Sequence, residues 1–305
     1  MTERGPTDQT VLVTGGAGFI GSHLVDRLVD DNEVRVLDNL STGSRENLPA
    51  HAELIVGDVR STDDLSRATQ GVDIVFHQAA QVSVERSIED PPGSFSSNLE
   101  PTIDILELAR QRDFRVIVAS SCAIYGNPEY TPIDEGHRKE PSSPYGLEKL
   151  TVDRYTRLYN ELYDIETVAL RYFNVYGPRQ SAGDYSGVIS IFREQAESGE
   201  DLTVEGDGQQ TRDFVHVDDI VRANMYAAET DETGYAYNVG TGSATSIREL
   251  AETIQDLSDS NSDIVHIAER KGDIAESEAD ITLIRDKMDF EPRIPLQQGL
   301  KSLMS

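Results

Sequence analysis

Short apolar runs recur through the first part of the chain, and each is followed by a stretch in which apolar residues recur at helical spacing. The runs occupy residues 11–13, 34–37, 54–56, 74–76, 116–119 and 167–171. Strands that alternate with helices predict an α/β fold with a doubly wound parallel sheet, the Rossmann arrangement. Ligands bind beyond the carboxyl ends of the strands in such sheets. We therefore expect one crevice to contain the residues that follow these runs, namely Asp38, Asp58, Ala79, Ser121 and Asn174.

The pattern loosens after Tyr176, where glycine and proline turns separate amphipathic stretches. Helices are expected near residues 189–196 and 247–257. We assign residues 1–176 to the Rossmann domain and residues 177–305 to a smaller C-terminal substrate lobe.

One later segment, residues 213–240, is expected to rejoin the Rossmann domain. It contains apolar runs at 215–217 and 237–239, and both are predicted to be strands of the main sheet.

A glycine-rich loop follows the first apolar run directly, as Thr14-Gly-Gly-Ala-Gly-Phe-Ile-Gly21. Gly15 permits the tight turn, and Gly18 lets a pyrophosphate approach the backbone. Gly21 lets the next helix pack closely on the strand, so that the helix N-terminus faces the anion. Strand, turn and helix in this order predict a dinucleotide site.

The second strand indicates which dinucleotide is bound. It ends at Asp38, 17 residues after Gly21, where an acid binds a ribose 2′-hydroxyl and repels a 2′-phosphate. Asn39 follows, and the glycine loop contains no arginine. These residues predict NAD rather than NADP.

A candidate base stands in Tyr145-Gly-Leu-Glu-Lys149. Positions i and i+4 share one face of a helix, so we expect the Lys149 ammonium to lie near the Tyr145 phenol and lower its pKa. Ser121 adds a hydroxyl that can hold the same substrate oxygen. The spacing alone is common by chance, and the glycine loop gives it weight.

With these motifs, the chain resembles the extended short-chain dehydrogenase/reductase superfamily. Within it, the chain is most similar to the nucleotide-sugar epimerases and dehydratases of the UDP-glucose 4-epimerase type. The resemblance runs through the glycine loop, Asp38–Gly43, Gly57–Val59, Phe76–Ala80, Ser120–Gly126, Tyr145–Lys149, Arg171–Arg179, Gly206–Asp218, Asn238–Gly240 and Arg270–Asp273.

The resemblance implies a cofactor site and a catalytic set. Ser121, Tyr145 and Lys149 would be catalytic. The residues implied to bind NAD are Gly15, Gly18, Phe19, Ile20, Gly21, Asp38, Asn39, Ser41, Thr42, Gly43, Asp58, Val59, Ala79, Ala80, Asn98, Tyr145, Lys149 and Tyr172.

It also implies how a sugar nucleotide is held. Arg212 and Arg270 would bind the diphosphate, Asn174 a phosphate, and Asp273 the ribose. Ser277 stands where the family limits the space around the 2-substituent of the sugar. The full set implied to contact substrate is Ser83, Ser121, Asn174, Val188, Arg212, Arg270, Asp273 and Ser277.

The residues after Ser121 bear on the reaction. Dehydratases and decarboxylases that resemble this chain carry further acids there, whereas this chain has Cys122 and Ala123, which cannot move protons at neutral pH. We therefore predict 4-epimerisation of a UDP-sugar of the UDP-glucose/UDP-galactose type. Tyr145 would take the 4-hydroxyl proton as hydride leaves C4 for NAD, and a transient 4-keto sugar would turn over before hydride returns.

Other substrates and functions also fit the sequence. Because Ser277 is small, UDP-GlcNAc is a possible substrate, and UDP-glucuronate is another. A nucleotide 4-keto-sugar reductase and a non-catalytic NAD-binding sensor are further alternatives.

The net charge of −28, with 5 lysines among 27 basic residues, predicts a halophilic cytoplasmic enzyme whose acidic surface suits molar salt. It argues against a nucleic-acid partner, because no basic stripe could displace counterions from phosphates. A single cysteine and no spaced histidine array predict neither a disulfide nor a metal site. No apolar run is long enough for a membrane span.

Several residues have plainer expectations. Arg179 and Arg193 should form surface ion pairs, while His77, His216 and Cys122 should be buried. The resemblance implies a homodimer formed through helices near Asn98–Arg110 and Leu150–Tyr163.

Overall fold

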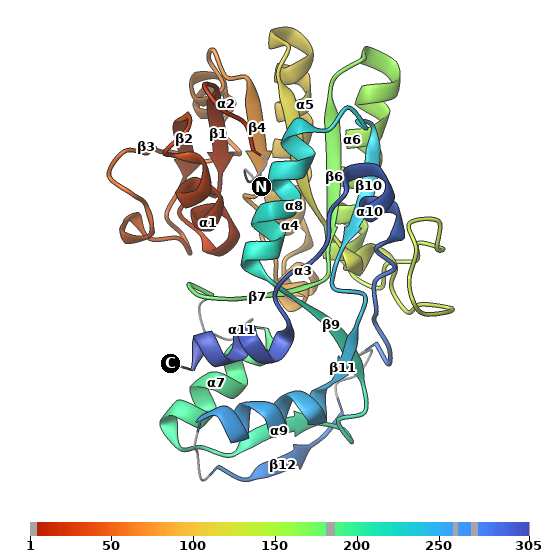
Figure 1. Cartoon of the computed structure of the whole chain (residues 1–305). Coiled ribbons are helices and arrows are strands. Elements are labelled where there is room, and N and C mark those ends of the chain that lie inside the picture. The colour runs from red at the N-terminus through yellow and green to blue at the C-terminus, as the bar shows by residue number, and fades with distance from the viewer. Residues whose placement is uncertain (1–4, 181–186, 259–261, 270–273, 305) are drawn as a thin grey trace.

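A parallel sheet covered by helices forms the larger part of the molecule (Figure 1). The computed structural model describes residues 5–180, 187–258, 262–269 and 274–304. Within these residues, the main sheet has seven strands in the order β10-β6-β5-β4-β1-β2-β3, all parallel. They are β1 (Thr10–Thr14), β2 (Glu33–Asp38), β3 (Glu53–Val56), β4 (Ile74–His77), β5 (Arg115–Ser121), β6 (Thr167–Tyr172) and β10 (Tyr235–Val239). The predicted doubly wound sheet is confirmed.

Alternate residues of the strands face two helical layers. In β1, Val11 and Val13 pack toward α1 (Phe19–Leu28), α8 (Val217–Glu229) and α10 (Thr282–Met288). Leu12 packs toward the opposite layer of α2 (Thr62–Ala68), α5 (Glu100–Arg112) and α6 (Pro144–Tyr163). Both faces of the sheet are therefore apolar and buried, as is usual for parallel strands. The short helices α3 (Val84–Glu89) and α4 (Pro91–Asn98) pack beside α6, and two 3-10 turns are η1 (Arg45–Asn47) and η2 (Cys122–Ile124).

The smaller lobe lies beyond the carboxyl ends of the main strands (Figure 1). One of its sheets joins β11 (Ala244–Ser246), β9 (Thr211–His216) and β7 (Asn174–Tyr176), and another joins β12 (Ile264–Ile267) with β8 (Leu202–Glu205). Its helices are α7 (Val188–Ser198), α9 (Ile247–Ser258) and α11 (Leu296–Leu303). The helices predicted at 189–196 and 247–257 are thus confirmed as α7 and α9. Phe192, Leu202 and Leu250 belong to a separate apolar core in this lobe.

The segment 213–240 rejoins the main sheet only in part. Residues 237–239 lie in β10, parallel to β6, as predicted. Residues 215 and 216 instead lie in β9, which pairs with β7 and β11, and Val217 begins α8. The strand prediction for 215–217 was therefore wrong about the sheet. A short apolar run marks a buried strand, but it does not say which strand will be its partner.

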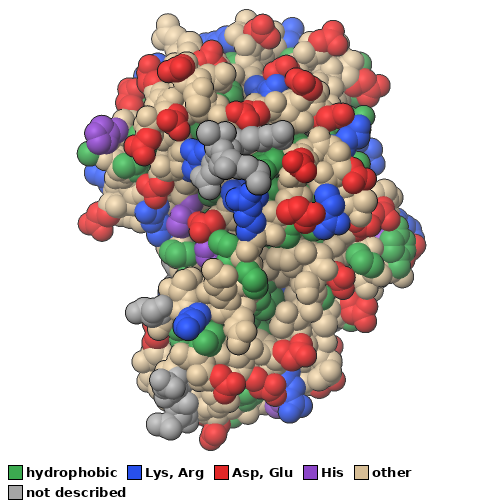
Figure 2. All heavy atoms as spheres, in the orientation of Figure 1, with side chains coloured by type: hydrophobic (Ala, Val, Ile, Leu, Met, Phe, Trp, Pro, Cys, Tyr) green, Lys and Arg blue, Asp and Glu red, His purple; other side chains and the backbone are tan. Residues whose placement is uncertain are grey.

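Acidic side chains are spread over both lobes on the face drawn in Figure 2, with Lys and Arg among them. No helix among the described residues is both long and apolar enough to cross a membrane.

Candidate active site

The glycine loop fits closely against the end of β4 and the start of α1. Gly15 has φ +67°, and a Cβ there would lie 2.8 Å from the Cα of Ala79. A Cβ on Gly21 would lie 2.2 Å from the carbonyl oxygen of Gly15. These two positions therefore require glycine, which agrees with the close turn and the close helix packing expected from the sequence.

Asp38 ends β2 beside this loop and is 8% exposed. Its Oδ2 accepts a hydrogen bond from Ala17 N at 2.9 Å, and its Oδ1 accepts one from Leu40 N at 2.8 Å. The carboxylate thus fixes the glycine loop from the strand end. Each carboxylate oxygen retains a further lone pair, so a ribose hydroxyl can also be bound.

The following loop is ordered by hydrogen bonds among its own polar groups. Asn39 Nδ2 donates to Asp58 Oδ2 at 3.0 Å, and Asn39 Oδ1 accepts from Ser41 N at 3.0 Å. The hydrogen bond from the Arg60 side chain holds the pKa of Asp58 well below its ordinary value. The structure therefore brings together β2 and the loop after β3, which carry predicted cofactor residues.

The residues present fit a dinucleotide. Helix α1 has no side-chain cap, so the N–H groups of its first turn can face an anion. Among the described residues, Ser120 Oγ near the end of β5 and Gln81 Oε1 in the loop after β4 are buried without a hydrogen-bond partner. Buried polar atoms usually have partners, so these atoms favour a polar ligand at this edge.

Tyr145 lies in the first turn of α6, and local capping fixes it there. Ser143 Oγ accepts from Gly146 N at 3.1 Å, and Tyr145 N donates to Ser87 Oγ at 3.1 Å. Ser121 is the last residue of β5, and its hydroxyl also accepts from Ala123 N at 3.1 Å. The structure therefore brings Ser121 and Tyr145 together at the end of one strand.

The Tyr145 phenol differs from the expectation based on sequence. Burial raises the pKa of Tyr145 to about 12, although a hydrogen bond with Ser121 acts in the opposite direction. Lys149 Nζ lies 5.9 Å from the centre of the Tyr145 ring and donates to Ala119 O at 2.8 Å. The predicted lowering of the phenol pKa by Lys149 is therefore wrong for the free protein, because desolvation outweighs a cation that is turned toward a backbone carbonyl.

Lys149 is itself buried, and burial lowers its pKa to about 8. His77 lies nearby on β4. Its Nδ1 is 2.8 Å from Thr14 Oγ1, and its Nε2 is 3.1 Å from Thr102 Oγ1. Burial, aided by the charge of Lys149, lowers the pKa of His77 to about 3. His77 is thus a hydrogen-bonded core histidine, as predicted, and is neutral at ordinary pH.

The predicted substrate residues lie on β7, β9 and the adjoining loops. Asn174 Nδ2 donates to Asp213 O at 3.1 Å, and Arg212 donates to Ile274 O at 2.6 Å. Burial raises the pKa of the Cys122 thiol to about 11, and the Arg212 charge opposes this rise. Arg212 therefore lies close enough to the turn after Ser121 to act on it electrostatically.

Of the other predicted substrate residues, three are placed by the structure and two lie outside the described residues. Ser277 is 5% exposed, Val188 begins α7, and Ser83 caps α3 by accepting from Arg86 N. Arg270 and Asp273 lie outside the described residues.

Partners within the protein are present for Tyr172, Arg179, Arg193 and His216. The Tyr172 hydroxyl accepts from Asn224 Nδ2 at 2.8 Å and from Gln78 Nε2 at 3.2 Å, so it is directed into the protein interior. Arg179 pairs with Asp26 at 2.7 Å, and Arg193 pairs with Glu197 at 3.6 Å, as predicted. His216 is buried, as expected, and its Nδ1 accepts from Asp218 N. In the described ranges, no three His, Cys, Asp or Glu side chains are grouped as metal ligands.

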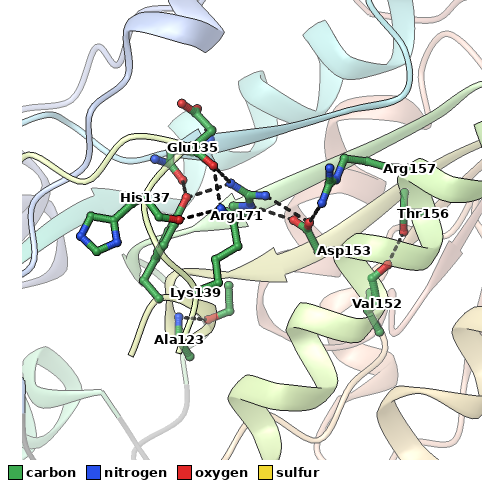
Figure 3. A network of polar contacts seen from close by, with 12 residues as sticks. Ala123, Glu135, His137, Lys139, Val152, Asp153, Thr156, Arg157 and Arg171 are labelled. Atoms are coloured by element: carbon green, nitrogen blue, oxygen red, sulfur yellow. Dashed lines mark hydrogen bonds and ion pairs between the residues drawn. The ribbon is translucent and has the colours of Figure 1, made fainter. Parts of the chain in front are cut away.

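A buried polar network joins α6 to β6 (Figure 3). Arg171 of β6 donates to both carboxylate oxygens of Asp153, at 2.7 and 3.1 Å. It also donates to the Tyr125 hydroxyl at 2.9 Å and to Glu135 O at 3.2 Å. Because Tyr125 follows η2 directly, the network connects α6 to the turn that contains Ser121.

Two polar residues that contact Asn98, namely Glu148 and Gln81, were not singled out from the sequence. Glu148 is 6% exposed, and Asn98 Nδ2 donates to its Oε2 at 2.7 Å. Gln81 N donates to Asn98 Oδ1 at 2.7 Å. Neither Glu148 nor Gln81 stands at a fixed position of the motifs, so the sequence contained no signal for them.

Known proteins match this chain along most of its length. The sequence profile of the NAD dependent epimerase/dehydratase family matches residues 11–240. A candidate UDP-glucose 4-epimerase of Methanocaldococcus jannaschii is 41% identical, with 97% of each chain covered.

Solved structures are similar to this chain both in fold and in sequence. A UDP-N-acetylglucosamine 4-epimerase from Methanobrevibacter ruminantium, in complex with UDP-N-acetylmuramic acid, has a TM-score of 0.94 and 38% identity over 98% of each chain. A UDP-glucose 4-epimerase from Thermus thermophilus in complex with NAD has a TM-score of 0.87 and 36% identity over 96% of each chain. With its parallel sheet, glycine loop and Tyr145–Lys149 pair, the chain belongs to the NAD-dependent epimerase/dehydratase family.

Proposed function

We propose that this protein catalyses the NAD-dependent 4-epimerisation of a UDP-sugar of the UDP-glucose/UDP-galactose type, through a transient 4-keto sugar. The observation that carries the proposal is the placement of Ser121 at the end of β5 and Tyr145 in the first turn of α6, close enough for the Ser121 hydroxyl to lower the pKa of Tyr145, with Lys149 one turn further along α6. Residues 1–176, with part of 213–240, would bind the cofactor, and residues 177–305 would bind the sugar nucleotide.

The residues of the site supply proton transfer and orientation. NAD, when bound, supplies the acceptor and donor of hydride for C4 of the sugar. Tyr145 Oη would take the proton of the 4-hydroxyl and later return it, while Ser121 Oγ holds the same oxygen. Lys149, one turn further along α6, would hold the ribose of the cofactor. The glycine loop and Asp38 would hold the cofactor, and Arg212 and Asn174 the diphosphate.

The turn after Ser121 argues against reactions beyond C4. Cys122 and Ala123 occupy this turn, and burial keeps the Cys122 thiol protonated by raising its pKa to about 11. A dehydratase or decarboxylase needs a further acid or base for carbons 5 and 6. The side chains here provide none, which favours epimerisation among the activities found in the family.

UDP-GlcNAc is a second candidate substrate, favoured by one specific residue. Ser277 has a small side chain, which would leave more room beside a sugar for an N-acetyl group than a larger residue at this position. The 38% identity with a UDP-N-acetylglucosamine 4-epimerase supports the same possibility. UDP-glucuronate is the less favoured alternative, because no described cation has been assigned to the sugar C6.

The deciding experiment uses purified protein in molar KCl with UDP-galactose and no added cofactor. We expect UDP-glucose to form, since a 4-epimerase regenerates its NAD in every cycle. Tyr145→Phe should reduce kcat by about 10²- to 10⁴-fold. Tyr155→Phe, on the same helix, is the matched control and should retain activity.

The alternatives give different results in this assay. Turnover of UDP-GlcNAc alone would reassign the substrate, and a requirement for added reduced cofactor would indicate a 4-keto-sugar reductase. Bound NAD without turnover of any UDP-sugar would favour a non-catalytic sensor and refute the proposed function.

We also infer a homodimer formed through α6, one of the two helices expected from the sequence, together with α3 and α4, because the exposed large apolar side chains lie on these helices and not on α5, the other expected helix. These adjoining helices carry a group of apolar side chains that are 42–59% exposed: Val84, Ile88, Phe95, Leu147, Leu158 and Leu162. Burial of such a group against a second copy of the chain would be favourable, because it removes apolar surface from water. Leu158→Asp should lower the mass measured by light scattering from dimer to monomer, whereas Ile267→Asp in the smaller lobe should not. A monomeric wild-type protein at micromolar concentration would refute the inference.

The net charge of −28 best suits a halophilic, cytoplasmic enzyme. The chain carries 55 acidic residues against 27 basic ones, and salt at about 1 M screens repulsion beyond roughly 3 Å. Denaturant midpoints should therefore be higher in 2 M KCl than in dilute buffer. Equal midpoints would contradict this inference.

A further inference from the structure

Glu148 is a buried carboxylate inside the Tyr145–Lys149 motif. It is 6% exposed and immediately precedes Lys149 on α6. A buried charge is costly unless other groups compensate for it. The compensating groups of Glu148 therefore indicate what this charge does.

Two neutral donors of α4 hold the carboxylate. Ser94 Oγ and Asn98 Nδ2 each donate to Glu148 Oε2 at 2.7 Å, and Asn98 Nδ2 also lies 3.3 Å from Ser94 Oγ. These hydrogen bonds satisfy the oxygen but leave its negative charge in place. The charge can therefore act on the neighbouring ionisable groups of the site.

The same contacts fix a loop beside the cofactor residues. With its amide nitrogen on Glu148, Asn98 presents Oδ1 to Gln81 N at 2.7 Å, and its Nδ2 also donates to Gln81 O at 3.0 Å. Gln81 directly follows Ala79 and Ala80, and its own Oε1 is buried without a partner among the described residues. Glu148 thus holds in register the loop that follows β4.

The electrostatic surroundings make Glu148 the compensating charge of Lys149. Burial lowers the pKa of Lys149 to about 8, and Glu148 opposes this change. Glu148 also acts with burial to raise the pKa of Tyr145. From the neighbouring elements, His77 of β4 and Cys122 of η2 face these groups. His77 is neutral at ordinary pH because its pKa is lowered to about 3, and Cys122 is a protonated thiol because its pKa is raised to about 11.

We propose that Glu148 is a positioning residue for the reaction: its carboxylate keeps Lys149 charged in a buried site and holds Asn98 and Gln81 against the cofactor loop. The proposal rests on the proposed epimerase function and assigns a role to a residue that does not contact the reacting atoms. It predicts two effects of the same carboxylate. Its charge sets the pH range of activity, and its hydrogen bonds hold the loop after β4 in place.

The test compares Glu148→Gln with wild type and with Glu161→Gln, an exposed position on the same helix. Glutamine keeps an oxygen that accepts from Ser94 and Asn98 but removes the charge. The NAD-loaded protein is labelled with ¹³C at lysine Cε, and the signal of Lys149 is assigned from Lys149→Met. The chain has 5 lysines, so its spectrum is simple.

We expect the titration midpoint of Lys149 to fall by about one pH unit in Glu148→Gln and to stay unchanged in Glu161→Gln. The pH profile of kcat should move in the same direction. At pH 6.5 activity is kept or increased, because the Tyr145 phenolate forms more readily. At pH 9 it falls about tenfold, because Lys149 has lost its proton.

Glu148→Ala removes the hydrogen bonds as well as the charge. It should weaken NAD binding about tenfold beyond Glu148→Gln, as measured by equilibrium dialysis of the cofactor. An unchanged Lys149 midpoint in Glu148→Gln, or an equal loss of kcat at every pH, would overturn the proposal. If wild type turned over no UDP-sugar, the proposed function would fail, and the lysine titration would still decide the inference.

Discussion

Arg171 and Asp153 form a two-point ion pair inside the protein, with their side chains 2% and 0% exposed. Arg157 donates to the same carboxylate at 2.9 Å, and Arg171 continues to the Tyr125 hydroxyl (Figure 3). The pair therefore joins β6, α6 and the turn after Ser121. The pair thus links the elements that carry Tyr145 and Ser121.

Asp153→Asn should destabilise the protein strongly, because it leaves the Arg171 guanidinium buried without its counter-charge. We expect a loss of about 3–5 kcal/mol in the free energy of unfolding, measured by denaturant titration. The control is Glu252→Gln, which breaks the exposed Arg248 pair, with side chains 55% and 50% exposed. That change should cost less than about 1 kcal/mol. Equal effects of the two variants would contradict the importance of the buried pair.

His77 should make stability depend on pH. Burial lowers its pKa to about 3 in the folded protein, whereas an unfolded histidine titrates near 6.5. The unfolded chain therefore binds more protons between these values, and stability falls as the pH decreases through this window. Above pH 7 the residue is neutral in both states and adds no slope.

The measurement compares unfolding free energies of wild type and His77→Gln at pH 7.5 and pH 5. Titration of the other groups is common to both proteins, so it cancels in the difference. Wild type should lose about 1–2 kcal/mol more than His77→Gln between these pH values. The same loss in both proteins would show that His77 does not stay neutral when folded.

The alternation of short strands and helices was sufficient to predict the main sheet, because a strand buried on both faces needs apolar residues throughout. It could not place β9, since a short apolar run does not specify whether β6 or β7 will be its neighbour. Pairing of β9 with β7 and β11 depends on tertiary contacts such as the buried Asp213 carboxylate, which accepts from Thr241 N and Ala279 N.

The candidate site shows a similar division between what the sequence could and could not predict. Helical spacing placed Lys149 one turn from Tyr145, but it could not tell that the ammonium turns to Ala119 O or that burial raises the phenol pKa. Glu148 had no signal, because it lies at a variable position between the two motif residues. Its role depends on α4, a distant part of the sequence.

Gly21→Ala should disturb the start of α1 and the cofactor site together. A Cβ at this position would lie 2.2 Å from Gly15 O, so the loop or the helix must shift. We expect a loss of about 1–3 kcal/mol in stability and markedly less NAD in the purified protein, measured after acid release. The control is Gly136→Ala, where the added Cβ would meet only the flexible Asp134 side chain. Normal NAD content in Gly21→Ala would refute the tight packing of this loop.

Ser277→Tyr tests which sugars fit. Ser277 is 5% exposed and lies just before Ala279, whose N donates to Asp213 beside Arg212, so a larger side chain would occupy space near the bound sugar. We expect the ratio of UDP-GlcNAc to UDP-galactose turnover to fall at least about tenfold, because the acetyl group competes with the ring for the same volume. Ser277→Ala should leave the ratio unchanged, and NAD content together with the unfolding midpoint will identify variants that misfold. A folded Ser277→Tyr protein with the wild-type ratio would remove Ser277 from the sugar pocket and place the control of the 2-substituent elsewhere in the smaller lobe.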